Sequence, residues 1–381
     1  MQYKDKGDRV VFYTEVRNKS IIKSSPANYI ISRDALKESG DYISRYGKTA
    51  QIVGGVRALA SLGDSFHTSL NNAGLTWQEY VFRGEVCDSQ IDSIMENARN
   101  CGAEVMVGVG GGKAIDAAKI AAYNLGIPVV CIPTIAATCA AVTPMSVLYH
   151  ENGIYKQDVF FPATPDMVIV DPAVIANAPV EYLKSGILDA IAKWYEGSAS
   201  IIGSKDIADI FDECALRVAA MLFEEMQNNA AEAIASVKER KVSEALITVI
   251  NLNIFFAGMI QSLGIKAVRN GIAHSIHNGL TVLAESHHIL HGYKVGYGIY
   301  VQLTLLGAQQ NMKTGTAEFF RKIGFTPSFN ELGLPYTEDT VKAVAEKTYN
   351  DPMMRKVPFN FITADMIAAA MHNIEKEYLT R

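Results

Sequence analysis

The chain has 381 residues, of which 49% are hydrophobic and 20% charged, enough for a large buried core in about two or three domains and too apolar for a disordered chain. Lys and Arg number 35 against 40 Asp and Glu, and the net charge of −5 excludes a broad basic surface for nucleic acid or anionic membrane. The five cysteines form no C-x-x-C pair and the N-terminus has no apolar signal-peptide stretch, so we expect a cytoplasmic protein with reduced thiols.

Short apolar runs alternate with helical patterns through the first half of the chain. The expected strands are 49–55, 76–82, 103–112, 128–134 and 166–171, and the expected helices between them are 56–73, 89–99 and 113–126. This alternation predicts βαβ units, and hence a parallel sheet with helices on both faces. The first 22 residues are polar and β-branched, and they fit either a hairpin or an extended arm.

The strand signal fades after Pro172, and the pattern is helical from about residue 181. We therefore expect an α/β dinucleotide-binding domain over 1–180 and an all-helical domain over 181–381. The stretch 245–265 is long and apolar enough to cross a bilayer, but Asn251, Asn253 and other polar residues interrupt it. A buried core helix of a soluble protein, with no membrane contact, is the interpretation that these polar residues favour.

A glycine-rich turn, GVGGGKAID over 108–116, joins an expected strand to an expected helix. Glycines there let backbone N–H groups approach a pyrophosphate, and a helix N-terminus favours anions. The spacing departs from G-x-G-x-x-G because Lys113 takes the third position, and from a P-loop because Ala114 replaces the Ser or Thr. Phosphate binding is favoured over a plain turn that needs glycine only for packing.

An earlier glycine pair, Gly54-Gly55, ends another expected strand. Nucleotide-binding folds place a carboxylate near such a strand end, where it binds the ribose hydroxyls and excludes a 2′-phosphate. No carboxylate is present here, and Arg57 follows two residues later. This favours NADPH over NADH; the alternative is an exposed Arg at a helix start.

Five histidines fall within eighteen residues of the helical half: His274, His277, His287, His288 and His291. Such density predicts a metal site, because imidazole and carboxylate ligands with an open position hold zinc or iron(II). The obvious carboxylate is in SGILDAIAKWYEG, where an Asp at 189 interrupts an apolar helical stretch, an unfavourable place unless a cation compensates it. The spacing does not choose which two histidines join this carboxylate.

Several segments together resemble the iron-containing alcohol dehydrogenase family, in its glycerol-dehydrogenase-like branch. They are GVGGGKAIDAAK, PTIAATCAAVTPMSVLYHENG, GILDAIAKWYE, AHSIHNGLTVL and HGYKVGYG. Their order and spacing match from about residue 22 onward, and TIAATCAA with D-x-x-AKWYE is most similar to a hydroxycarboxylate-oxidising member. The resemblance implies a Rossmann-like N-terminal domain, a helical C-terminal domain with the active site in the cleft, and a homo-oligomer.

The same resemblance implies roles for individual residues. Asp189, His274 and His291 match the family's metal ligands, with Zn²⁺ expected and Fe²⁺ the alternative, and His277 matches a position beside them. Gly55 replaces an Asp of NAD-preferring members, which again favours NADP(H) over NAD(H). The matching cofactor positions are Gly110, Gly111, Gly112, Lys113 and Ala114 in the pyrophosphate loop, then Thr134, Ile135, Ala136 and Ala137, and Thr143, Met145 and Tyr149 on the nicotinamide side.

Three positions bear on the substrate. Cys139 stands where polyol-oxidising relatives have an Asp, Lys193 stands where the iron enzymes have a His, and Arg269 recurs in the hydroxycarboxylate relative. Lys193 and Arg269 indicate an anionic substrate, hence reduction of a 2-oxo acid to the 2-hydroxy acid; the alternatives are an ion pair of Lys193 with Asp189 in a metal-free site and a surface Arg269. A polyol dehydrogenase, a dehydroquinate-synthase-like lyase and a catalytically silent nucleotide-binding protein are the other functions considered.

Overall fold

The computed structural model describes residues 26–203, 209–264 and 271–379. The arm or hairpin expected for the first 22 residues and the expected substrate-binding Arg269 lie outside the described residues. Both therefore stay predictions.

The chain divides into two compact units, each described by itself. One contains the described residues up to Pro179 together with Ser236–Ser262, and the other contains Val180–Ala235 and the described residues from Leu263 onward. The sequence places 236–262 in the helical domain, whereas the structure groups it with the first unit. The domain division at residue 180 stays a prediction.

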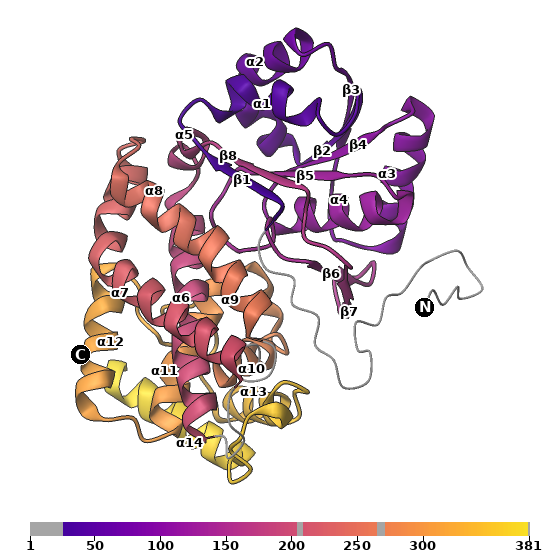
Figure 1. The fold of residues 1–381 in the computed structure, drawn as a ribbon. Coiled ribbons are helices and arrows are strands. Elements are labelled where there is room, and N and C mark those ends of the chain that lie inside the picture. The colour runs from indigo at the N-terminus through magenta and orange to yellow at the C-terminus, as the bar shows by residue number, and fades with distance from the viewer. Residues whose placement is uncertain (1–25, 204–208, 265–270, 380–381) are drawn as a thin grey trace. The chain divides into compact units, whose positions relative to one another are not determined.

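The first unit is built on a six-stranded parallel sheet with the strand order β1-β8-β5-β4-β2-β3 (Figure 1). The strands are β1 (Asn28–Ile31), β2 (Thr49–Gly54), β3 (Thr76–Val81), β4 (Val105–Gly110), β5 (Val129–Pro133) and β8 (Met167–Val170). β6 (Met145–Tyr149) and β7 (Tyr155–Phe160) form a separate antiparallel pair. The predicted parallel α/β architecture is confirmed.

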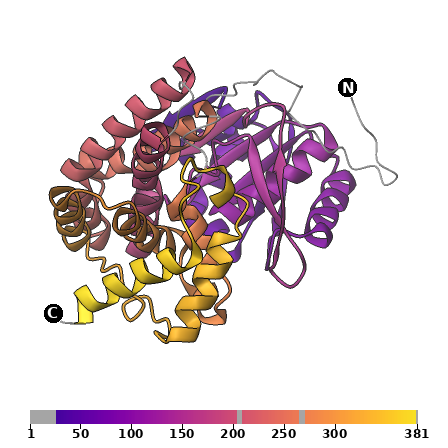
Figure 2. The same cartoon turned by 90° about the horizontal axis from the view of Figure 1, so that it is seen from below.

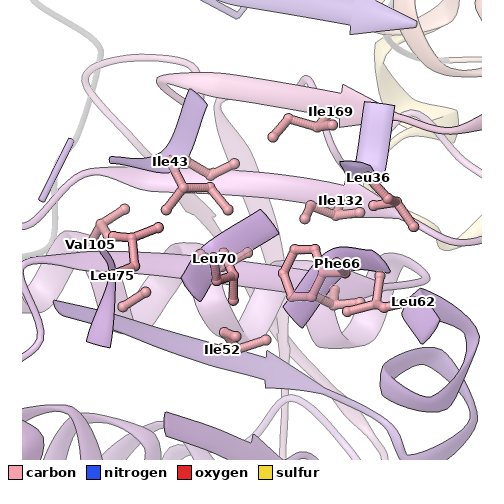
Figure 3. Close-up of a cluster of buried hydrophobic side chains, with 14 of the residues drawn as sticks. Leu36, Ile43, Ile52, Leu62, Phe66, Leu70, Leu75, Val105, Ile132 and Ile169 are labelled. Carbon is pink, nitrogen blue, oxygen red and sulfur yellow. The ribbon is translucent and has the colours of Figure 1, made fainter. Parts of the chain in front are cut away.

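Helices cover both faces of this sheet. Successive side chains of each strand point to opposite faces, and both faces carry apolar side chains that must be buried. Ile52 of β2 packs with Phe66 and other side chains in the cluster of Figure 3, whereas Val53 packs in a second cluster with residues of α3 and α4. The helices of this unit before residue 180 are α1 (Ala35–Ile43), α2 (Val56–Asn72), α3 (Asp88–Cys101), α4 (Gly112–Leu125) and α5 (Pro172–Ala176). Burial on both faces explains why the central strands are continuous apolar runs.

The apolar stretch near residue 250 forms α8 (Glu244–Asn251), a π-helical turn η1 (Leu252–Phe256) and α9 (Ala257–Leu263). Among the described residues it is the one stretch long and apolar enough to span a membrane, and 56% of its most apolar window is buried. The asparagines that interrupt it are bonded within the first unit: Asn251 Oδ1 accepts a hydrogen bond from Tyr29, and Asn253 Nδ2 donates to the carbonyl of Ala136. These contacts are those of a core helix.

The second unit is helical, and no strand follows β8 among the residues described (Figure 2). Its longer helices are α6 (Val180–Gly203), α7 (Ile210–Lys238), α10 (Ile272–Leu280), α11 (His291–Leu305), α12 (Gln310–Lys322), α13 (Glu338–Tyr349) and α14 (Ala364–Leu379), with short 3-10 turns η2 (Ala284–His288) and η3 (Met354–Lys356). Glycines on α11 allow close helix packing, since a Cβ at Gly292 would lie 1.8 Å from the Ser185 carbonyl oxygen of α6 and one at Gly298 would lie 2.3 Å from that of Ala273 in α10. The three helices α6, α10 and α11 therefore approach closely.

Candidate active site

Three helices of the second unit bring together the side chains that the resemblance assigns to the metal. Asp189 lies on α6, His274 on α10, and His291 is the first residue of α11, and one potential ligand atom from each lies within 4.8 Å of the others. Asp189 Oδ1 is 3.2 Å from His274 Nε2 and 3.3 Å from His291 Nε2. Of the other three histidines in this part of the sequence, His287 and His288 are exposed on η2.

The electrostatics of this cluster fit a bound cation. Burial raises the pKa of Asp189, but the His274 and His291 hydrogen bonds and the Lys193 charge outweigh it and hold the pKa well below its usual range. Burial lowers the pKa of His274, yet the charges and hydrogen bonds of Glu196 and Asp189 raise it to about 10. The His274 ring thus lies between two buried carboxylates whose negative charges favour a cation here, and a divalent ion held by two imidazoles and one carboxylate can supply that positive charge.

A second carboxylate, Glu196, lies against His274 and was not predicted. Its side chain accepts hydrogen bonds from His274 Nδ1, at 2.7 Å, and from the His274 backbone N–H, at 2.8 Å. Glu196 is seven residues after Asp189, with Lys193 between them at the fourth position, so all three lie on one face of α6. That spacing is a sequence signal that could have identified Glu196.

His277 contacts His291, the third of the predicted ligands, rather than Asp189 or His274. Its Nε2 is 3.1 Å from His291 Nδ1, and its Nδ1 is 2.9 Å from Asn278 Oδ1. The Asn278 amide in turn donates to Asp351 Oδ2 at 2.9 Å. Burial and the nearby His291 hold the pKa of His277 well below its usual range, so this ring is neutral. Neither Asn278 nor Asp351 was predicted.

Three groups of predicted cofactor positions lie in the first unit at the carboxyl ends of neighbouring parallel strands. Gly55 follows β2, the pyrophosphate loop follows β4, and Thr134 follows β5, while the register pairs Gly54 with Val109 and Gly110 with Pro133. The chain moves outward from β2 to β3 and then returns across β2 to β4. Ligands of open parallel sheets bind at such a reversal of strand order.

The pyrophosphate loop has a backbone that suits an anion. Gly110 has φ 137°, a conformation that favours glycine, and α4 begins after Gly111 with no side chain capping its first turn. The Thr134 N–H donates to the Gly110 carbonyl at 3.1 Å, so the 134–137 segment lies directly beside this loop. Lys113 forms an ion pair with Glu85, with 2.5 Å between Nζ and Oε1, and Ala114 is buried in the following helix turn.

A buried lysine that was not predicted holds the segment with two of the expected nicotinamide-side positions, Thr143 and Met145. Lys119 of α4 is 2% exposed and donates to the carbonyls of Ala140, Thr143 and Met145, and its ammonium lies 3.0 Å from Asp116 Oδ1. Asp116 also accepts from a backbone N–H of β6. The helix that follows the glycine loop is thereby tied to the segment with the expected nicotinamide contacts.

Two further predicted residues lie near this segment. Tyr149, at the end of β6, is half-buried, and burial together with nearby carboxylates raises its pKa to about 12, so the phenol is neutral. Cys139 is half-buried in the loop before β6 and belongs to the first unit, whereas Lys193 belongs to the second. None of the five cysteines, all of which lie among the described residues, forms a disulfide.

Comparisons with known proteins agree with this arrangement. The family model described as iron-containing alcohol dehydrogenase matches residues 26–172. Glycolaldehyde reductase of Halobacterium salinarum is 32% identical over 357 residues, which cover 92% of this chain and 96% of the relative. Hydroxycarboxylate dehydrogenase A of Escherichia coli (strain K12) is 30% identical over 352 residues, covering 92% and 96%.

A solved structure is similar over the same extent. The glycerol dehydrogenase of Schizosaccharomyces pombe superposes with a TM-score of 0.85 at 28% identity, covering 95% of this chain and 92% of that one. The resemblance noted in the sequence is therefore confirmed. The chain belongs to the iron-containing alcohol dehydrogenase family and is a nicotinamide-dependent dehydrogenase that acts on CH–OH groups.

Proposed function

We propose that this enzyme reversibly reduces a small 2-oxo acid to the 2-hydroxy acid with NADPH, using a metal held by Asp189, His274 and His291. The donor set of two imidazoles and one carboxylate suits Zn²⁺, with Fe²⁺ as the alternative. When bound, the metal acts as a Lewis acid that stabilises negative charge developing on the substrate oxygen. The glycine loop and the 134–137 segment bind the cofactor through backbone groups at the strand ends.

The observation that carries the substrate assignment is the position of Lys193. Its side chain is 5% exposed, lies one helical turn after Asp189, and its charge contributes to the low pKa of that carboxylate. Hydrogen bonds between an ammonium and a carboxylate are strong because both groups are charged, and a 2-oxo acid brings a carboxylate beside the carbonyl to be reduced. Lys193 thus orients an anionic substrate. Cys139 stands in place of the Asp of polyol-oxidising relatives, so no negative charge at this position repels a substrate carboxylate.

A polyol dehydrogenase is the second candidate. The similarity to the Schizosaccharomyces pombe glycerol dehydrogenase favours it, and glycolaldehyde reductase of Halobacterium salinarum is likewise named for an uncharged substrate. In that function the Lys193 charge affects Asp189 but binds no substrate carboxylate. The two candidates differ in which carbonyl compound is reduced.

Oxidation of NADPH with 2-oxobutanoate or 2-oxoglutarate, measured beside dihydroxyacetone, tests the proposal. We expect saturable turnover of the oxo acids that a chelator abolishes, and Lys193→Thr should raise KM for the oxo acids by about 10–100-fold with little change for a neutral ketone. Lys184→Thr on the same helix is the control and should behave as wild type. Turnover of dihydroxyacetone alone, or equal effects of Lys193→Thr on both substrates, would support the polyol function.

The cofactor preference has its own test at Gly55. A Cβ there would meet no atom within 4 Å, and φ −71° with ψ 154° suits any residue, so Gly55→Asp adds a carboxylate without strain. The new charge repels a 2′-phosphate and accepts hydrogen bonds from a free ribose, so the ratio of kcat/KM for NADPH to that for NADH should fall about 10–100-fold. Gly55→Asn is the uncharged control. An unchanged ratio in both variants would remove Gly55 from cofactor selection.

We also propose a homo-oligomer that works in the cytoplasm. The resemblance to the family supports the assembly, and five cysteines without a disulfide are typical of a protein in a reducing compartment.

A further inference from the structure

We propose that two buried carboxylates outside the ligand set, Glu196 and Asp351, are positioning residues that fix the tautomers of both histidine ligands. Each would make its histidine present the Nε2 lone pair toward Asp189. The inference rests on the proposed metal site, and it concerns residues that the resemblance did not assign.

The first connection is direct. A carboxylate only accepts hydrogen bonds, so the 2.7 Å contact between Glu196 and His274 Nδ1 requires the proton of the neutral ring on Nδ1. Nε2 then carries the lone pair, on the side where Asp189 Oδ1 lies 3.2 Å away. The other Glu196 oxygen accepts from the His274 backbone N–H in the first turn of α10, where no side chain from Gly271 caps the helix.

Gly271 makes room for this carboxylate. A Cβ at that position would lie 2.2 Å from the Glu196 Cδ, a distance that no pair of such atoms adopts. The backbone of Gly271, with φ −148°, is extended and suits any residue, so packing against Glu196 accounts for the glycine.

The second connection runs through two intermediate side chains. Asp351 accepts from the Asn278 Nδ2 at 2.9 Å, which directs the Asn278 Oδ1 to His277 and requires a proton on His277 Nδ1. The His277 Nε2 is then an acceptor, so the His291 Nδ1 at 3.1 Å must donate to it. The lone pair of His291 is left on Nε2, 3.3 Å from Asp189 Oδ1. Asp351 also accepts from the Met353 N–H at 2.8 Å, which fixes its orientation.

Both connections end at side chains that are almost fully buried, with Glu196 3% and Asp351 8% exposed. Groups that orient histidine ligands in this way typically change metal affinity 10–100-fold when they are removed. Isosteric amides separate this role from packing, because an amide keeps the shape but offers one acceptor and one donor group in place of two acceptors.

In Glu196→Gln only one side-chain oxygen remains. It accepts from the His274 backbone N–H, which is always a donor, so the amide NH₂ faces His274 Nδ1. The ring must then carry its proton on Nε2 and loses its ligand lone pair. In Asp351→Asn the oxygen of the new amide still accepts from the Met353 N–H, so its NH₂ faces Asn278. The Asn278 amide must then flip, and the protons of His277 and His291 both move from Nδ1 to Nε2.

The experiment uses the purified full-length chain, stripped of metal, and Zn²⁺ in competition with a chromophoric chelator. We expect Glu196→Gln and Asp351→Asn each to weaken Zn²⁺ binding 10–100-fold while the metal-free Tm stays close to wild type. The ¹⁵N spectrum of labelled histidine should show that the His277 proton lies on Nδ1 in the wild type and on Nε2 in Asp351→Asn. Exposed Glu181→Gln on α6 and Asp339→Asn on α13 are the matched controls.

Wild-type affinity in both amide variants would overturn the inference and leave the metal site intact. Absence of stoichiometric Zn²⁺ binding in the wild-type chain, or wild-type binding in His274→Ala, would instead overturn the metal site and this inference with it. If one amide variant failed to fold, the affinity of the other would decide.

Discussion

Replacing His274 with Ala is expected to lower kcat/KM for oxo-acid reduction about 10³-fold or more while NADPH still binds. The change removes one of the three ligands and also the ring that lies between Asp189 and Glu196. The Asp189 and Glu196 carboxylates, both buried, then lose the hydrogen bonds of the ring that lies between their negative charges. The expected cofactor positions belong to the first unit, so NADPH affinity, followed by nicotinamide fluorescence, should change little.

His287→Ala and His288→Ala are the controls for this prediction, because both side chains are exposed on η2 in the same histidine-rich segment. They should retain wild-type activity and Zn²⁺ content. Unchanged turnover in His274→Ala would remove the metal from the mechanism, and loss of NADPH binding would show a fold defect rather than a ligand defect.

The sheet could be predicted from the sequence because its central strands are buried on both faces. Such strands need an apolar side chain at nearly every position, and the runs at 49–55 and 103–112 correspond to β2 and β4. The edge strand β1, which was not predicted, has four half-exposed or exposed residues, and its one partner among the described strands is β8, far along the chain. A short edge strand leaves no comparable local pattern.

The site shows the same division between local and long-range information. Asp189 could be identified because a charge interrupts an apolar helix, and the helical period places Lys193 and Glu196 on its face. Asp351 reaches the site only because α13 packs against α10, and nothing in its neighbouring residues indicates that contact. The grouping of 236–262 with the first unit likewise depends on tertiary contacts, such as that of Asn253 with Ala136.

Replacing Lys119 with Met is expected to destabilise the first unit by about 3–5 kcal/mol. Met has a similar length and no charge, so the carbonyls of Ala140, Thr143 and Met145 lose their shared donor and the Asp116 carboxylate loses its buried partner. Urea unfolding of the metal-free chain measures the loss. NADPH should also bind more weakly, because the freed segment carries the expected nicotinamide contacts.

The matched control is Lys113→Met on the same helix, since its ion pair with Glu85 is partly exposed and should contribute less than about 1 kcal/mol. Adding Asp116→Asn to Lys119→Met removes the unpaired buried charge while the Asn oxygen still accepts from the Val147 N–H. The double variant should therefore recover part of the lost stability. NADPH affinity should stay low if the Lys119–Asp116 pair fixes the position of the 140–145 segment. Equal stability of Lys119→Met and Lys113→Met would mean that the buried ammonium is replaceable and that the backbone alone holds the 140–145 segment in place.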